Sequence, residues 1–256
     1  MNLEDNISCD GAAPQPVVLS EEDASSSGES TEAVAKNPGA RLPTIHLSSP
    51  AFRLNKIQEW FLPSNFSQST LDGRFGSNAC VVIALEVVQT FLSRDMALPQ
   101  AGQQPPLELV HGFIGAMRNG CEHYESVPGL AFLSVDRALA LWPGLKLGIA
   151  NHGDFAFFNE KHVKDWLPKE MARRCANKSS IPYAAVFVQT PYSVCVVVQQ
   201  GVVGILDSHS HGSLGGLIAL SGPSATSADV VAYLAKFHGQ ALPTAVLFEW
   251  LPLVLH

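Results

Sequence analysis

Cys80 occupies a position where a thiol would be activated. It follows the segment GRFGSNA and starts the strongest helical pattern of the chain, in which apolar residues recur at i, i+3, i+4, i+7, i+8 and i+11. The amino end of a helix carries a partial positive charge, which favours a thiolate over a thiol. Cys80 is therefore a candidate nucleophile, although its place on the apolar stripe also suits a buried core cysteine. Ser77 or Asn78 is the expected N-cap of this helix.

A carboxylate and an imidazole stand two residues apart in the later segment ILDSHSHG, where a predicted strand ends. Alternate side chains of an extended chain point to one face, so Asp207 could orient His209 and stabilise it as an imidazolium. His209 would then be the base for Cys80. His211 has the same parity and could exchange roles with His209. The plainer alternative is a polar turn in which Asp207 caps backbone amides.

A thiol that attacks a carbonyl also needs hydrogen-bond donors for the developing oxyanion. Gln68, twelve residues before Cys80, is the first candidate for a side-chain donor, and the backbone amide of Cys80 could assist it. Asn78 is the second candidate. Without the cysteine, Gln68 would be read as an ordinary surface glutamine.

The elements that must position these residues change from helical to extended patterns along the chain. Apolar periodicity predicts helices from residue 77 to 91 and over 107–117, 133–141, 165–174 and 228–237, and a short helix around residues 57–62. Runs rich in β-branched residues predict strands over 184–190, 193–200, 202–208, 215–222 and 245–255. Short turns between the strands favour an antiparallel meander, so the fold class is predicted as α+β, with a helical front half packed on an antiparallel sheet.

Composition divides the chain into two parts and excludes several functions. Residues 1–45 carry eight acidic side chains against two basic ones and are rich in Ser, Pro and Ala, which predicts a disordered acidic tail before a domain at 46–256. The rest of the chain is nearly neutral, so neither nucleic acid nor a membrane surface is an expected partner. No stretch is long and apolar enough to span a membrane. Five widely spaced cysteines without a CxxC pair favour free thiols in the cytoplasm or nucleus.

Taken together, Gln68, the helix start GSNAC and the later DSH resemble the papain-like deubiquitinating peptidases of the herpesvirus large tegument protein family. The resemblance spans roughly residues 55–250. It implies a papain-like fold in which Cys80 is the nucleophile, His209 the base, Asp207 its orienting carboxylate and Gln68 the oxyanion donor. It also implies cleavage of ubiquitin or ubiquitin-like conjugates without a cofactor, and a monomer is expected.

Two other functions fit the same residues. Asp207, His209 and His211 form D-x-H-x-H, whose ligand types suit zinc or iron, although further ligands would have to come from elsewhere in the chain. Alternatively, the domain could keep the fold and use its cleft only to bind ubiquitin or another protein, because a fold does not fix a function.

Overall fold

The computed structural model describes residues 45, 47, 56–150, 156–158, 165–189, 192–237 and 248–256. They belong to a compact unit that runs from Pro43 to His256. Ile45 and Leu47 are partly buried against its core. The predicted acidic tail lies outside the described residues, apart from Ile45, and remains a prediction.

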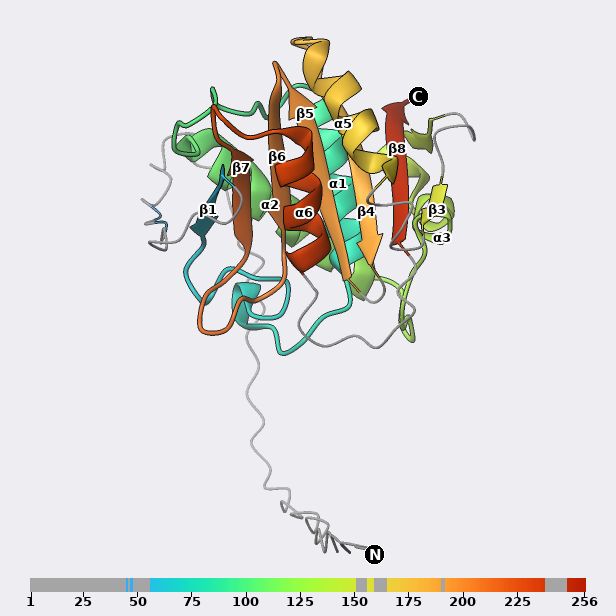
Figure 1. Cartoon of the computed structure of the whole chain (residues 1–256). Coiled ribbons are helices and arrows are strands. Elements are labelled where there is room, and N and C mark those ends of the chain that lie inside the picture. Colours follow the sequence, from blue (N-terminus) through green and yellow to red (C-terminus); the bar gives the residue numbers. More distant parts are fainter. Residues whose placement is uncertain are drawn as a thin grey trace, which may run out of the picture. The chain divides into compact units, whose positions relative to one another are not determined.

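An eight-stranded sheet forms the centre of this unit (Figure 1). Its order is β1-β7-β6-β5-β4-β8-β2, with β3 also pairing β8, and every strand pair is antiparallel. The strands are β1 (Ile57–Phe61), β2 (Leu147–Ile149), β3 (Ala156–Phe158), β4 (Tyr183–Gln189), β5 (Tyr192–Gln199), β6 (Val202–Asp207), β7 (Leu217–Ser221) and β8 (Phe248–Leu255). The predicted meander is β4 to β7, and β8 pairs the free side of β4.

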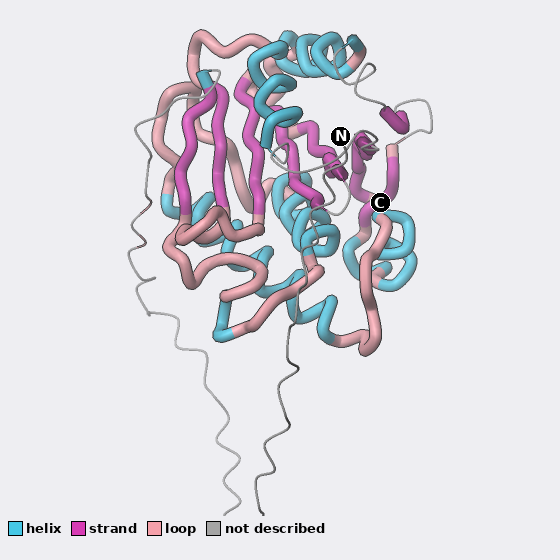
Figure 2. Tube along the Cα trace, turned by 60° about the horizontal axis from the view of Figure 1, so that its bottom comes forward, coloured by secondary structure: helices cyan, strands magenta, loops and turns pink. Residues whose placement is uncertain are grey.

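Helices cover both faces of the sheet, as Figures 1 and 2 show. One core lies between the sheet and α1 (Cys80–Leu92), α2 (Leu107–Glu125) and α3 (Val135–Leu141). A second core lies on the other face, under α5 (Leu167–Ala176) and α6 (Ser227–Phe237). Because both faces of the central strands are buried, β4 to β6 contain continuous apolar runs (184–188, 194–198 and 202–206) instead of alternating apolar and polar residues. The protein therefore has a mixed helical and antiparallel-sheet fold.

The prediction of a short helix around residues 57–62 was wrong, because Ile57–Phe61 is strand β1. It pairs with β7 along its length, from Ile57 opposite Ser221 to Phe61 opposite Leu217. This pairing covers an edge of the meander and provides hydrogen-bond partners for the backbone groups of both strands. The periodicity of residues 57–62 alone cannot predict it, because the partner strand is distant in sequence. The front half of the chain therefore contributes strands as well as helices. The helix predicted over 107–117 continues to Glu125, where Ser126 ends it.

Candidate active site

Cys80 is the first residue of α1 and is 5% exposed. The N-cap of the helix is Ala79, with no side-chain hydrogen bond, so the prediction of Ser77 or Asn78 as the cap was wrong. Ser77 lies one step outside, where its Oγ accepts from the Ala79 amide at 3.2 Å. Because no side chain caps the helix, its first amides remain available to another acceptor beside the thiol.

Asp207 ends strand β6 and is fully buried. Its Oδ1 accepts a hydrogen bond from the backbone amide of His209 at 3.0 Å and also contacts Nδ1 of the same residue. Strand β6 therefore delivers the carboxylate, and the first residues after it fold back over that carboxylate. This arrangement fixes the imidazole through Nδ1, which leaves Nε2 to face another group.

The imidazole of His209 meets the thiol of Cys80, which hydrogen-bonds to it. Burial alone would lower the pKa of His209, but the charge and hydrogen bond of Asp207, together with the Cys80 contact, raise this pKa to about 10. Burial alone would likewise raise the pKa of Asp207, but His209 and His211 hold it far below its usual range. The fold thus gathers a thiol, an imidazole and a carboxylate from sites more than 120 residues apart in sequence.

His211 occupies the second oxygen of the same carboxylate, with its Nε2 3.1 Å from Oδ2 of Asp207. Its ring also packs edge-on against Phe61 of β1, at 5.3 Å between centroids. The spacing in the sequence did not distinguish His209 from His211 as the base. In the structure, His209 contacts the Cys80 thiol. Tyr192 of β5 packs edge-on against the His209 ring at 5.0 Å.

Gln68 is buried and joins the two halves of the site. Its Nε2 donates to the carbonyl oxygen of Ser77 at 2.9 Å, three residues before Cys80. Its Oε1 accepts from Ser208 Oγ at 2.9 Å, and its backbone amide donates to the Ser208 carbonyl at 2.8 Å. The amide side chain thus bridges the segment before the thiol and the residue between Asp207 and His209. One N–H of the amide remains for a further acceptor.

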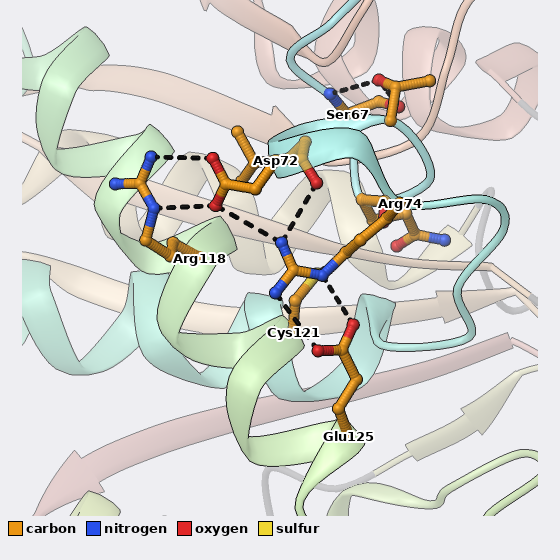
Figure 3. A network of polar contacts seen from close by, with 9 residues as sticks. Ser67, Asp72, Arg74, Arg118, Cys121 and Glu125 are labelled. Carbon is orange, nitrogen blue, oxygen red and sulfur yellow. Dashed lines mark hydrogen bonds and ion pairs between the residues drawn. The ribbon is translucent and has the colours of Figure 1, made fainter. Parts of the chain in front are cut away.

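An ion-pair network fastens the segment before Cys80 to helix α2 (Figure 3). Asp72 binds the Arg118 guanidinium through two hydrogen bonds of 2.9 and 3.2 Å, and Arg74 binds Glu125 through another two, of 2.6 and 3.2 Å. Hydrogen bonding to Arg118 keeps the pKa of Asp72 below its usual value, despite the opposing effect of burial. These pairs hold a turn in which Asp72 itself adopts a left-handed backbone, with φ of 55°.

A small pocket of about 50 Å³ lies beside the thiol. It is lined by Asn78, Cys80, Val81, Phe132, Leu133, Val188 and Ser193. Ser193 Oγ is buried there and has no hydrogen-bond partner among the described residues. Phe132 and Ser193 could not be predicted from local patterns in the sequence, because only the pairing of β4 with β5 and the return of the chain after α2 bring them to Cys80. Asn78 also lines this pocket, whereas Gln68 does not.

In the D-x-H-x-H segment, the two imidazoles share the carboxylate of Asp207. Each imidazole is turned to a different oxygen of Asp207. Over the described part of the chain, no group of three or more His, Cys, Asp or Glu side chains is placed to hold a metal ion. None of the four cysteines within the described ranges forms a disulfide. The helices that the structure describes include none with the length and apolar character needed to cross a membrane.

No protein-family model matches the chain, and no curated protein matches it. Among solved structures, the chain is similar to the crystal structure of the Pseudomonas avirulence protein AvrPphB, with a TM-score of 0.41 and 9% sequence identity. The match covers 70% of this chain and 92% of that one.

Proposed function

We propose that this protein is a cysteine peptidase of papain-like architecture. The observation that carries the proposal is the hydrogen-bonded series from the Cys80 thiol through the His209 imidazole to the buried Asp207 carboxylate. A nucleophile, a base and an orienting group in this order are the parts that thiol-dependent acyl transfer requires. The helical amino end at Cys80 adds a positive field that favours the thiolate.

In the proposed reaction, His209 takes the proton of Cys80 and the thiolate attacks the carbonyl carbon of the scissile bond. The Cys80 backbone amide and the free N–H of Gln68 stabilise the oxyanion that forms. The imidazolium then gives its proton to the leaving amine, and the substrate acyl group remains on the sulfur as a thioester. Water, deprotonated by His209, attacks this thioester, and its cleavage restores the thiol.

We further propose that the substrates are conjugates of ubiquitin or a ubiquitin-like protein, cleaved by a monomer in the cytoplasm or nucleus. The resemblance of Gln68, GSNAC and DSH to the viral deubiquitinases supports this substrate class. A pocket of about 50 Å³ has room for roughly three to five water-sized groups, so it suits residues with small side chains, such as the terminal glycines of ubiquitin. Phe75 and Phe132 are exposed, and Phe132 borders the thiol pocket, so a protein substrate could bury them.

Covalent trapping tests both levels of the proposal. Ubiquitin and its relatives, each carrying a C-terminal electrophile, are incubated side by side with the full chain and with Cys80→Ala. We expect a ubiquitin-type probe to label the wild type and not Cys80→Ala, while the melting temperature stays nearly unchanged. Cys175→Ala is the matched control, because Cys175 is the most exposed of the four described cysteines and should not affect labelling.

The possible outcomes separate the alternatives. Labelling by a small peptide electrophile but by no ubiquitin-type probe would keep the peptidase and reject the substrate class. Binding of ubiquitin without any covalent adduct would favour a non-catalytic binding module of the same fold. Equal labelling of wild type and Cys80→Ala would refute the nucleophile.

A further inference from the structure

A second pocket lies away from the thiol, where helices α1 and α2 meet the turn after α3. Its volume is about 440 Å³, within the range of small-molecule sites and several times that of the thiol pocket. It is lined by Glu86 and Gln89 from α1, Asn119 and His123 from α2, Leu141 at the end of α3, and the following residues Trp142, Pro143, Gly144 and Leu145. The proposed peptidase mechanism uses none of these residues.

The pocket contains a carboxylate that is costly to bury. Glu86 lies in the middle of α1, and its side chain is only 8% exposed. Burial raises its pKa, and the nearby His123 and Asn119 only partly oppose this effect. His123 Nδ1 lies 2.9 Å from Oε1, but this imidazole is a counter-charge only when it is protonated. Among the described residues, no Lys or Arg pairs with Glu86.

A second acceptor stands one turn further along the same helix. Gln89 lies three residues after Glu86, so both side chains occupy one face of α1. Its Oε1 is buried and accepts no hydrogen bond from any described residue. A buried acceptor without a donor costs free energy, as does a buried charge without a counter-charge. A ligand with a positive charge and several N–H groups would satisfy both.

The lining of the pocket also includes two aromatic rings. The rings of His123 and Trp142 are stacked, with centroids 6.0 Å apart and planes 25° from parallel. The indole of Trp142 borders the pocket, and the face of an indole attracts cations. Leu145 and Leu141 add apolar surface for an alkyl stem. A carboxylate, a carbonyl oxygen and an aromatic ring around one cavity are the groups that bind a guanidinium or an alkylammonium.

We propose that this pocket binds an organic cation with a guanidinium or primary ammonium head and a short alkyl stem. Glu86 and Gln89 accept hydrogen bonds from the head, and Trp142 packs against it. A metal ion is a poorer occupant, since the described residues contain no cluster of three or more His, Cys, Asp or Glu placed to hold one. The cation is either a free small molecule or the end of an arginine or lysine side chain presented by another protein.

Calorimetric titration of the full chain tests the proposal with butylguanidinium, butylammonium and the neutral pentanamide. We expect saturable binding of the two cations and none of the amide. Glu86→Gln should weaken cation binding at least about tenfold. Trp142→Leu should weaken it about two- to fivefold. Glu122→Gln, which removes an exposed carboxylate of α2 outside the pocket, is the matched control and should change nothing.

Three results would contradict the proposal that this pocket binds an organic cation. Pentanamide binding as tightly as the cations, no saturable heat with either cation, or full affinity in Glu86→Gln would overturn the proposal. Should Glu86→Gln fail to fold, Gln89→Leu provides the same test, because it removes one acceptor and keeps the carboxylate. N-acetyl-arginine methylamide then identifies the source: affinity like that of butylguanidinium assigns the pocket to a protein side chain, and a loss of affinity assigns it to a free cation.

Discussion

Oδ2 of Asp207 lies 3.1 Å from Nε2 of His211, while the other oxygen of the same carboxylate holds His209. One buried charge therefore contacts two imidazoles, and His209 also meets the Cys80 thiol. Loss of His211 would leave the bond between Asp207 and His209 in place. Loss of His209 would remove the group that stabilises a thiolate.

Alkylation of Cys80 by iodoacetamide near neutral pH measures this difference without a substrate, because the thiolate is the reactive form. We expect His209→Gln to slow alkylation by roughly tenfold or more, and His211→Gln to change it by less than about threefold. Mass spectrometry of the modified peptide identifies the thiol. Equal effects of the two substitutions would contradict the assignment of His209 as the base.

The pH dependence of stability should report the pair formed by His209 and Asp207. The pKa of His209 is raised from 6.5 to about 10 in the folded protein, so its stabilisation is complete below pH 6.5 and is lost as pH rises toward 10. The pKa of Asp207 is lowered, so its stabilisation is complete above its ordinary value of 3.8 and declines in more acidic solution. The pair therefore contributes most between about pH 4 and 6.5.

Urea unfolding in the Cys80→Ala background checks this expectation, because the thiol no longer titrates. Above pH 6.5 the free energy of unfolding should fall by up to about 1.4 kcal/mol per pH unit from this group. The fall should end at a lower pH than in the wild type, because the Cys80 contact no longer raises the pKa of His209. Adding Asp207→Asn should flatten that slope, since burial then lowers the pKa of the imidazole without opposition. An unchanged slope would mean that the titration of another group causes the pH dependence of the free energy of unfolding.

Local patterns in the sequence were sufficient for α1 and for the strands of the meander. The helical stripe after Cys80 and the β-branched runs from residue 184 onward depend on near neighbours, and short turns then determine strand order. The segment Ile57–Phe61 was misread because its partner, β7, lies about 160 residues later and turns the same apolar residues into a strand.

The finer parts of the site depended on packing that no short pattern contains. Ser193 reaches the thiol pocket only because β5 pairs with β4, and Glu86 finds His123 only because α1 packs on α2. The choice between His209 and His211 likewise required the position of Cys80. The spacing of two residues is consistent with both imidazoles contacting Asp207. The fold then brings His209 to the Cys80 thiol.

Substitution of Gln68 should lower the rate of the proposed reaction by more than the loss of its structural hydrogen bonds would explain. Gln68→Ala removes the proposed oxyanion donor and should lower kcat by roughly 100- to 1000-fold with little change in KM. Ser208→Ala is the matched control, because it removes the donor to Gln68 Oε1 at 2.9 Å and leaves the amide N–H groups intact. Rates are measured with the substrate form of the probe that labels Cys80. Equal rate losses in the two variants would reduce Gln68 to a structural bridge.

Two glycines of α2 should respond in opposite ways to alanine, because only one of them touches α1. A Cβ at Gly120 would lie 2.7 Å from the Cα and 2.8 Å from the backbone nitrogen of Ile83, three residues into the helix that begins with Cys80. Backbone atoms cannot move aside as a flexible side chain can, so Gly120→Ala must push the helices apart and should destabilise the protein by about 1–3 kcal/mol.

Gly115 lies in the same helix, where a Cβ would meet nothing within 4 Å. Gly115→Ala should therefore stabilise the protein by about 0.5–1 kcal/mol, the usual gain of alanine over glycine inside a helix. Thermal and urea unfolding of both variants measure these changes. Because the displaced helix carries Cys80, Gly120→Ala should also slow alkylation of the thiol at neutral pH, whereas Gly115→Ala should leave it as in the wild type. A stable Gly120→Ala variant with normal thiol reactivity would contradict the close contact of α1 and α2.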